Sequence, residues 1–72
     1  MNLSNTQSGL WYFIKDIKVH NPKLLKRLEA LGFFKGERIL VVSNWGGFAI
    51  IKIKDSKIAL NNKITKFITV KV

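Results

Sequence analysis

The chain has 72 residues, no cysteine and a formal net charge of +9 at pH 7. This length allows a single domain, and the lack of cysteine excludes disulfide bonds and thiolate metal sites. Hydrophobic residues make up 47% of the sequence, which excludes a disordered chain. The positive charge favours nucleic acid, an anionic membrane surface or an acidic protein as partner, or it reflects only a solvated, lysine-rich surface.

The first eight residues contain neither a basic region nor an apolar stretch of signal-peptide length. No apolar run in the chain approaches the roughly 20 residues that span a bilayer. We therefore expect a soluble, cytoplasmic protein. Residues 1–8 are expected to form an N-terminal segment, and residues 9–72 a single folded domain.

The first strand is expected within residues 10–20, which are rich in β-favouring residue types. Side chains on a strand alternate between its two faces. Both faces are apolar at the beginning of this strand, because Trp11 and Phe13 alternate with Tyr12 and Ile14. Either the strand is buried on both sides, or one side is reserved for a partner.

A short helix is expected after this strand. Asn21 is a preferred N-cap residue, and Pro22 suits the first helical position, where its missing N–H has no cost. Four leucines follow at helical spacing, and Gly32 can end the helix in a left-handed conformation. Because so short a helix is marginal alone, we expect its leucine face to pack on the rest of the fold.

The remainder of the chain has the pattern of strands and turns. The Gly46-Gly47 pair suits a two-residue hairpin, and the apolar residues Ala49, Ile51 and Ile53 follow with a period of two. These signals predict a mainly β fold, a curled sheet of about five antiparallel strands with one inserted short helix. The expected later strands are residues 38–43, 49–54, 58–60 and 67–72, with turns at 55–56 and 61–62.

No catalytic constellation is visible in the sequence. The single histidine, His20, follows Asp16 by four residues, which places the two side chains about 13 Å apart on a strand. That separation is too large for a hydrogen-bonded pair or a shared metal ion. Neither a nucleophile motif nor a phosphate-binding glycine loop is present. We therefore predict that the protein is not an enzyme and that His20 faces solvent.

The aromatic residues, which are interleaved with lysines, allow two interpretations. They could stack nucleic-acid bases, as in small barrels that bind single strands, or they could fill the core and contact a protein. We expect Phe33 and Phe67 to lie in the core. Trp45 and Phe48 flank the hairpin tip, where burial is difficult, and exposed aromatic side chains there favour a protein contact.

Several segments in a defined order carry a family resemblance. Residues 27–36 end a helix with Leu-x-x-Leu-Gly and continue through two phenylalanines to Lys35 and a second glycine. Residues 58–60 read Ile-Ala-Leu before a turn, and residues 68–70 read Ile-Thr-Val near the end. This pattern resembles the FeoA family, the small cytoplasmic proteins of bacterial ferrous iron uptake. Lys35 stands where that family commonly has proline, and Asn61 where it usually has arginine, so no arginine contact is transferred to position 61.

The resemblance implies an SH3-like barrel with an inserted helix. It also implies an accessory protein that binds and regulates or supports FeoB, a membrane transporter of ferrous iron with a cytosolic GTP-binding domain. No cofactor is implied. With one histidine and four scattered acidic residues, a high-affinity Fe(II) site within one chain is not expected. Weak or intermolecular binding of Fe(II) or another divalent metal stays open.

A protein–protein surface is expected on the basic side of the helix and on the exposed aromatic residues. The charge also draws the protein to an anionic inner membrane, at roughly 1 kcal/mol per well-placed basic side chain. A peripheral location at that membrane is therefore an expectation. The alternatives are a basic small barrel that binds nucleic acid, which is less favoured, and a homo-oligomer formed through the apolar first strand. The predicted partner-binding residues are Lys26, Arg27, Phe34, Trp45 and Phe48.

Overall fold

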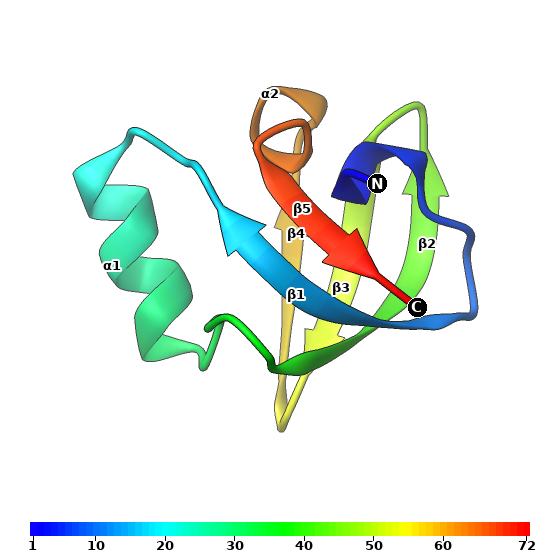
Figure 1. Ribbon diagram of the computed structural model, residues 1–72, viewed down its shortest axis with the longest axis horizontal. Coiled ribbons are helices and arrows are strands. Elements are labelled where there is room, and N and C mark those ends of the chain that lie inside the picture. Colours follow the sequence, from blue (N-terminus) through cyan, green and yellow to red (C-terminus); the bar gives the residue numbers. More distant parts are fainter.

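Five strands form one antiparallel sheet in the computed structural model, which describes residues 1–72 (Figure 1). In chain order the elements are η1 (Leu3–Asn5), β1 (Trp11–Ile17), α1 (Pro22–Ala30), β2 (Arg38–Trp45), β3 (Phe48–Ile53), β4 (Ser56–Leu60), α2 (Asn62–Thr65) and β5 (Ile68–Lys71). The strand order across the sheet is β4-β3-β2-β1-β5. The predicted fold, with a helix inserted after the first strand, is confirmed. The turn predicted at residues 61–62 is instead the beginning of the one-turn helix α2.

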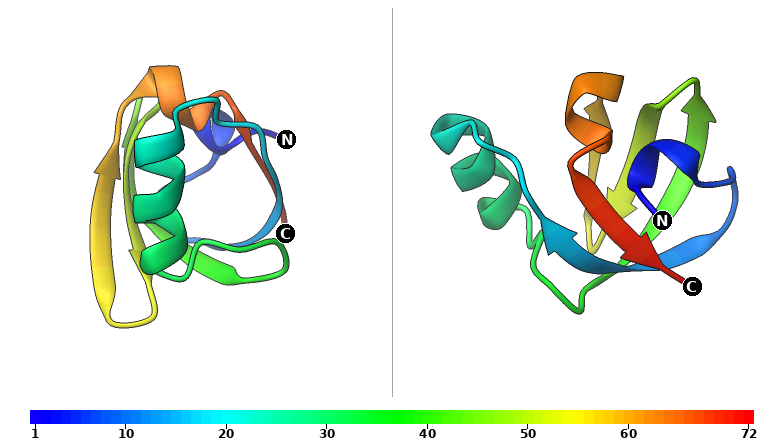
Figure 2. Two further views of the ribbon diagram at one scale, coloured as in Figure 1. Left: turned by 90° about the vertical axis from the view of Figure 1, so that its left-hand side faces the viewer. Right: turned by 45° about the horizontal axis from the view of Figure 1, so that its top comes forward.

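Two irregularities curl the sheet. The pairing of β2 with β3 shifts register between Val41 and Ser43, and the pairing of β1 with β5 shifts between Ile14 and Asp16. A bulge of this kind bends its strand and increases the local twist. The sheet therefore wraps around its own inner face, as Figure 2 shows from two further directions.

Alternate residues of the strands face the inside of the curled sheet. In β1, Tyr12 and Ile14 are 2% and 1% exposed, whereas Trp11 and Phe13 are 49% and 40% exposed. The interpretation in which the strand is buried on both sides is therefore wrong, and the side that carries Trp11 and Phe13 is exposed. The core consists of Leu3, Tyr12, Ile14, Val19, Leu28, Phe33, Ile39, Val41, Ala49, Ile51, Ile53, Ile58, Leu60, Ile68 and Val70.

The beginning of α1 has the predicted cap. The side-chain oxygen of Asn21 accepts a hydrogen bond from the Leu24 N–H at 3.1 Å, and Pro22 is the first helical residue. The cap satisfies one of the N–H groups that a helix leaves free at its first turn. Of the leucines, Leu28 alone is completely buried, so α1 is attached to the core along a narrow stripe.

The end of α1 is a Schellman motif. The Phe33 N–H donates to the Leu28 carbonyl at 2.9 Å, and the Gly32 N–H donates to the Glu29 carbonyl at 3.0 Å. Gly32 has a φ of +92°, the left-handed conformation predicted for it. Leu28 and Phe33, which flank the motif, are completely buried and anchor this end of the helix in the core.

The β2–β3 hairpin is joined directly to α2. Gly46-Gly47 has φ angles of +57° and +94°, and its flanking residues Trp45 and Phe48 pair across the hairpin. The Thr65 hydroxyl of α2 donates a buried hydrogen bond of 2.6 Å to the Gly47 carbonyl. A Cβ atom at Gly47 would lie 2.8 Å from the Cβ of Asn62, so only glycine permits this close packing.

The N-terminal segment packs against the sheet. Leu3 is completely buried, and Asn2 forms an isolated bridge with Thr69 of β5. The Val70 N–H donates to the Met1 carbonyl at 2.8 Å. The first residues thus cover part of the outer edge of β5, whereas β4 pairs with β3 alone.

Three further local expectations were wrong. Phe67 is 49% exposed rather than buried, because it precedes β5 on the opposite side of the chain from the buried Ile68. Val72 is 83% exposed because it lies beyond the end of β5. The turn predicted at residues 55–56 lies one residue earlier, since Lys54 has a φ of +51° and Ser56 already belongs to β4.

Candidate functional site

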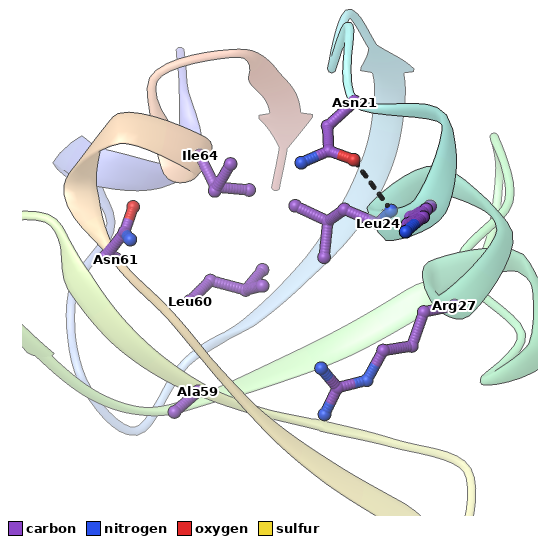
Figure 3. Close-up of a pocket in the computed structure, with 8 residues that line it drawn as sticks. Asn21, Leu24, Arg27, Ala59, Leu60, Asn61 and Ile64 are labelled. Atoms are coloured by element: carbon purple, nitrogen blue, oxygen red, sulfur yellow. Dashed lines mark hydrogen bonds between the residues drawn. The ribbon is translucent and has the colours of Figure 1, made fainter.

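A groove of about 450 Å³ separates α1 from β4 and α2 (Figure 3). It is the one cavity of this size in the structure. Its walls come from segments that are far apart in the sequence, so the groove exists only in the folded chain. The residues that line it are Asn21, Lys23, Leu24, Arg27, Ala59, Leu60, Asn61 and Ile64.

The floor of the groove is apolar. Leu24, Leu60 and Ile64 point toward one another from α1, β4 and α2 in Figure 3. Leu60 is 3% exposed, and the other two are half-buried and pack against the core. Their remaining apolar surface can be removed from water by a ligand, which stabilises a complex by roughly 25 cal/mol per Å². The floor therefore favours an apolar ligand group.

Two asparagine caps hold the walls of the groove. The Asn21 side chain caps α1 at Leu24, which is the hydrogen bond drawn as a dashed line in Figure 3. The Asn61 side-chain oxygen accepts from the Lys63 N–H at 3.0 Å and caps α2. Each cap secures the helical turn that carries a floor side chain. The two caps therefore help to hold Leu24 and Ile64 in place on opposite walls of the groove.

The rim of the groove is positively charged. Lys23 and Arg27 are exposed, and no acidic residue lines the groove. Neither side chain takes part in the two ion pairs of the structure. The planar fork of an arginine can bind a carboxylate through two parallel hydrogen bonds. The rim thus favours a ligand that carries carboxylates near an apolar group.

The groove also borders an unpaired strand edge. Ala59 and Leu60, which line it, belong to β4, and β4 has a partner on one side only. An unpaired edge can accept an extended peptide as an additional strand. Together, the apolar floor, the cationic rim and this edge suit an extended peptide segment with apolar and acidic side chains.

The five predicted partner-binding residues lie in separate places. Arg27 lines the groove, whereas its neighbour Lys26 is exposed on α1 and does not line it. Phe34 is 48% exposed in the connection between α1 and β2. Trp45 and Phe48, at 81% and 45% exposed, flank the β2–β3 hairpin, away from α1 (Figure 1). The structure therefore does not bring these residues together as one surface.

The sequence-based prediction missed the apolar floor of the groove. Leu24 was assigned to a helix face that packs on the core, and Ile64 was placed after a simple turn. One signal for the wall formed by α2 was available, because Asn61 is a strong N-cap residue three positions before Ile64. No comparable signal shows that Leu60 approaches Leu24, since that contact depends on how the sheet curls.

The titratable groups do not form a reactive cluster. No three histidine, cysteine, aspartate or glutamate side chains are grouped where they could hold a metal ion. Asp16 has the one resolved pKa change: desolvation raises its pKa, but hydrogen bonds from Lys35 and from the Ile17 N–H outweigh this effect and hold the pKa below its usual value. The Lys35 amino group lies 3.4 Å from the Asp16 carboxylate. This pair is on the surface and outside the groove.

The chain matches the family model of the FeoA domain over residues 1–72. Among solved structures, iron(II) transport protein A from Clostridium thermocellum is 31% identical, with a TM-score of 0.83 over 100% of this chain and 45% of that chain. FeoA from Stenotrophomonas maltophilia, solved with zinc, is 25% identical, with a TM-score of 0.80 over 99% of this chain and 89% of that chain. That protein is described as a prokaryotic SH3 domain protein and a candidate activating factor of bacterial ferrous iron transport.

A manganese-dependent transcriptional repressor shares the fold alone, at 18% identity and a TM-score of 0.80 over 100% of this chain and 40% of that chain. No curated protein sequence matches the chain. These similarities confirm the predicted SH3-like fold. No helix of the structure has the length and apolar character needed to cross a bilayer.

Proposed function

This chain belongs to the FeoA family, a family of small accessory domains of ferrous iron transport, and on this premise we propose that it binds the cytosolic side of a FeoB-type membrane transporter. It acts there through a protein–protein contact that regulates or supports transport, without catalysing a reaction itself. The description of the Stenotrophomonas protein as a candidate activating factor supports this role. Iron is the cargo of the transporter in this proposal, and the chain requires no cofactor.

The observation that carries the proposal is the groove between α1 and β4. Its apolar floor, formed by Leu24, Leu60 and Ile64, lies beside the unpaired cations Lys23 and Arg27. A catalytic pocket would need titratable groups in contact with one another, and the lining holds no acid and no histidine. A recognition groove needs what is present: apolar surface for affinity and charge for orientation. The ligand we propose is an extended segment of the transporter with apolar and acidic residues.

An NMR titration of the labelled protein with the cytosolic domain of its cognate transporter tests the proposal. We expect amide shifts concentrated in α1, β4 and α2 that persist at moderate salt. Ala59→Arg fills the groove from an exposed position, so it should weaken binding strongly without unfolding the protein. Arg27→Glu reverses the charge of the rim and should weaken binding about tenfold, the size of one well-formed charged contact.

Lys26→Glu is the matched control, because it makes the same charge change on the same helix outside the groove. It should reduce the affinity much less than Arg27→Glu. Equal losses for the two variants, or unchanged binding in Ala59→Arg, would show that the groove is not the contact. An absence of any shift at low salt would contradict the proposed partnership itself.

A further inference from the structure

The exposed apolar side chains are concentrated on one side of the molecule. Except for Phe34 and Phe67, they belong to the N-terminus, the beginning of β1, the segments β2 and β3 near their hairpin, and the C-terminus. These segments lie on the side away from α1 (Figure 1). The side chains that matter most here are Leu10, Trp11, Phe13, Val42, Trp45 and Val72.

The strand register places cations directly beside the aromatic residues. Phe13 is opposite Arg38 of β2 and Lys71 of β5, and Trp11 is opposite Leu40 of β2. The Arg38 guanidinium lies 4.3 Å from the centroid of the Trp11 ring. All five side chains belong to the outer side of the sheet, since the alternate residues of β1 and β2 are buried. We call this surface, formed by Trp11, Phe13, Arg38, Leu40 and Lys71, the aromatic face.

No acidic residue offsets the charge of the aromatic face. Asp16, at the far end of β1, and Glu37, before β2, each have a lysine amino group within 4.0 Å. The other two acidic residues, Glu29 and Asp55, lie in α1 and in the turn between β3 and β4. The aromatic face therefore combines apolar side chains with positive charges that no acidic residue neutralises.

We propose that the aromatic face binds the surface of an anionic phospholipid bilayer. Aromatic side chains are favoured at the level of the lipid headgroups, and lysine and arginine near them are attracted to anionic lipids. Leu10 precedes Trp11 in the chain, and Val42 follows Leu40 on the outer side of β2. Both aliphatic side chains are exposed and can enter the boundary of the acyl region. Trp45, 81% exposed at a hairpin tip, provides a further aromatic contact on the same side of the molecule.

Two other occupants of this face fit less well. Nucleic-acid bases need free, flat aromatic surfaces, but Arg38 already covers one side of the Trp11 ring, and half of the neighbouring exposed side chains are aliphatic. A second copy of the chain would bring two cationic faces together, and each copy carries a net charge of +9. An anionic bilayer provides negative headgroups for the cations and an acyl region for the apolar side chains.

This inference rests on the proposed function and adds an orientation to it. The groove is bordered by α1, β4 and α2, whereas the aromatic face belongs to β1, β2 and β5, and β4 and β5 are at opposite ends of the strand order. A bilayer bound at the aromatic face thus leaves the groove open to a cytosolic segment of the transporter. Binding at the membrane would raise the local concentration of the protein beside that segment.

Cosedimentation with vesicles tests the inference without any transporter. The probes are vesicles of phosphatidylcholine alone and of phosphatidylcholine with phosphatidylglycerol. We expect binding to the anionic vesicles only, weakened by added salt as the charges are screened. In Trp45→Phe, the one remaining tryptophan, Trp11, should show a blue-shifted emission on binding because it leaves water.

Surface variants locate the contact. Phe13→Ala should lower the vesicle affinity about tenfold, since one large aromatic side chain no longer leaves water. Lys71→Gln should lower it about fivefold, the effect of one basic group near an anionic surface. Phe34→Ala and Lys26→Gln are the matched controls, because these residues are also exposed but lie in or next to α1. Both controls should retain the affinity of the unchanged protein.

Three results would distinguish binding to an anionic bilayer from the alternatives. Failure to bind anionic vesicles at low salt, or equal losses in Phe13→Ala and Phe34→Ala, would overturn the inference. Tighter binding of a single-stranded oligonucleotide that depends on Trp11 would assign the face to nucleic acid instead. Ala59→Arg, which blocks the groove, should bind vesicles normally. A failure of vesicle binding can therefore be told apart from a failure of the proposed transporter contact.

Discussion

The groove and the aromatic face both present apolar side chains beside cations, but they are built in different ways. The aromatic face follows from a single period of two along β1, with partners supplied by its neighbouring strands. The groove joins side chains from two stretches of the chain that are far apart in the sequence, residues 21–27 and residues 59–64. A substitution that disturbs one element should leave most of the aromatic face intact. The groove is more sensitive, because it depends on the relative positions of α1, β4 and α2.

The largest expected effect comes from Gly47→Ala, which acts where α2 meets the β2–β3 hairpin. The new Cβ would lie 2.8 Å from the Cβ of Asn62, and the φ of +94° is unfavourable for alanine. We expect the free energy of unfolding to fall by roughly 2–4 kcal/mol, measured by urea denaturation. Ligand binding in the groove should weaken with it, because α2 forms one wall.

Gly46→Ala is the control for this prediction. Its φ is +57°, and a Cβ there would meet nothing within 4 Å. Only the conformational cost of about 1 kcal/mol is expected. Similar losses at the two glycines would show that the packing of α2 on the hairpin contributes little to stability.

A smaller effect is expected from Asn21→Ala, which removes the cap of α1. The free energy of unfolding should fall by about 1 kcal/mol, the usual cost of losing an N-cap side chain. Because the cap secures the turn that carries Leu24, groove binding should weaken while vesicle binding is unchanged. Asn5→Ala, at an exposed asparagine that caps no α-helix, is the control and should leave both unchanged. Loss of vesicle binding in Asn21→Ala would contradict the independence of the two surfaces.

The smallest effect concerns the Asp16–Lys35 pair, which links the end of β1 to the connection that follows α1. Its hydrogen bonds hold the pKa of Asp16 below the usual value, so the folded state releases this proton more readily than the unfolded state. The stabilisation is therefore present above the unfolded pKa, and it is lost as the pH falls below about 4 toward the folded value. The stability difference between the unchanged protein and Asp16→Asn should shrink over that range.

Glu29→Gln is the control for the titration, since Glu29 takes part in neither ion pair of the structure. Its stability difference from the unchanged protein should vary less with pH. If the stability difference between the unchanged protein and Asp16→Asn stayed constant through the acidic range, the pKa of Asp16 would not be lowered in the folded state.

Most of the fold was predictable because its signals are local. Asn21-Pro22 and Gly32 mark the ends of α1, and Gly46-Gly47 marks the hairpin, through backbone preferences that act over a few residues. The candidate site was less predictable. Of the residues that line the groove, only Arg27 was among the predicted partner-binding residues. The floor side chains have the same apolar character as core residues, so composition does not distinguish them.

The sequence by itself determined the family, the order of the five strands and of α1, and the hairpin at Gly46-Gly47. It left open which faces of β1 are buried, and the fold decided this, with Tyr12 and Ile14 inside and Trp11 and Phe13 outside. Only the tertiary structure decided where the groove lies, because the bulges in β1 and β2 curl the sheet, and the curl brings β4 and α2 opposite α1. Local preferences act within a few residues of the chain. A contact between distant segments, such as that between α1 and β4, depends on the combined bending of several strands. It therefore cannot be predicted from the residues of any one segment.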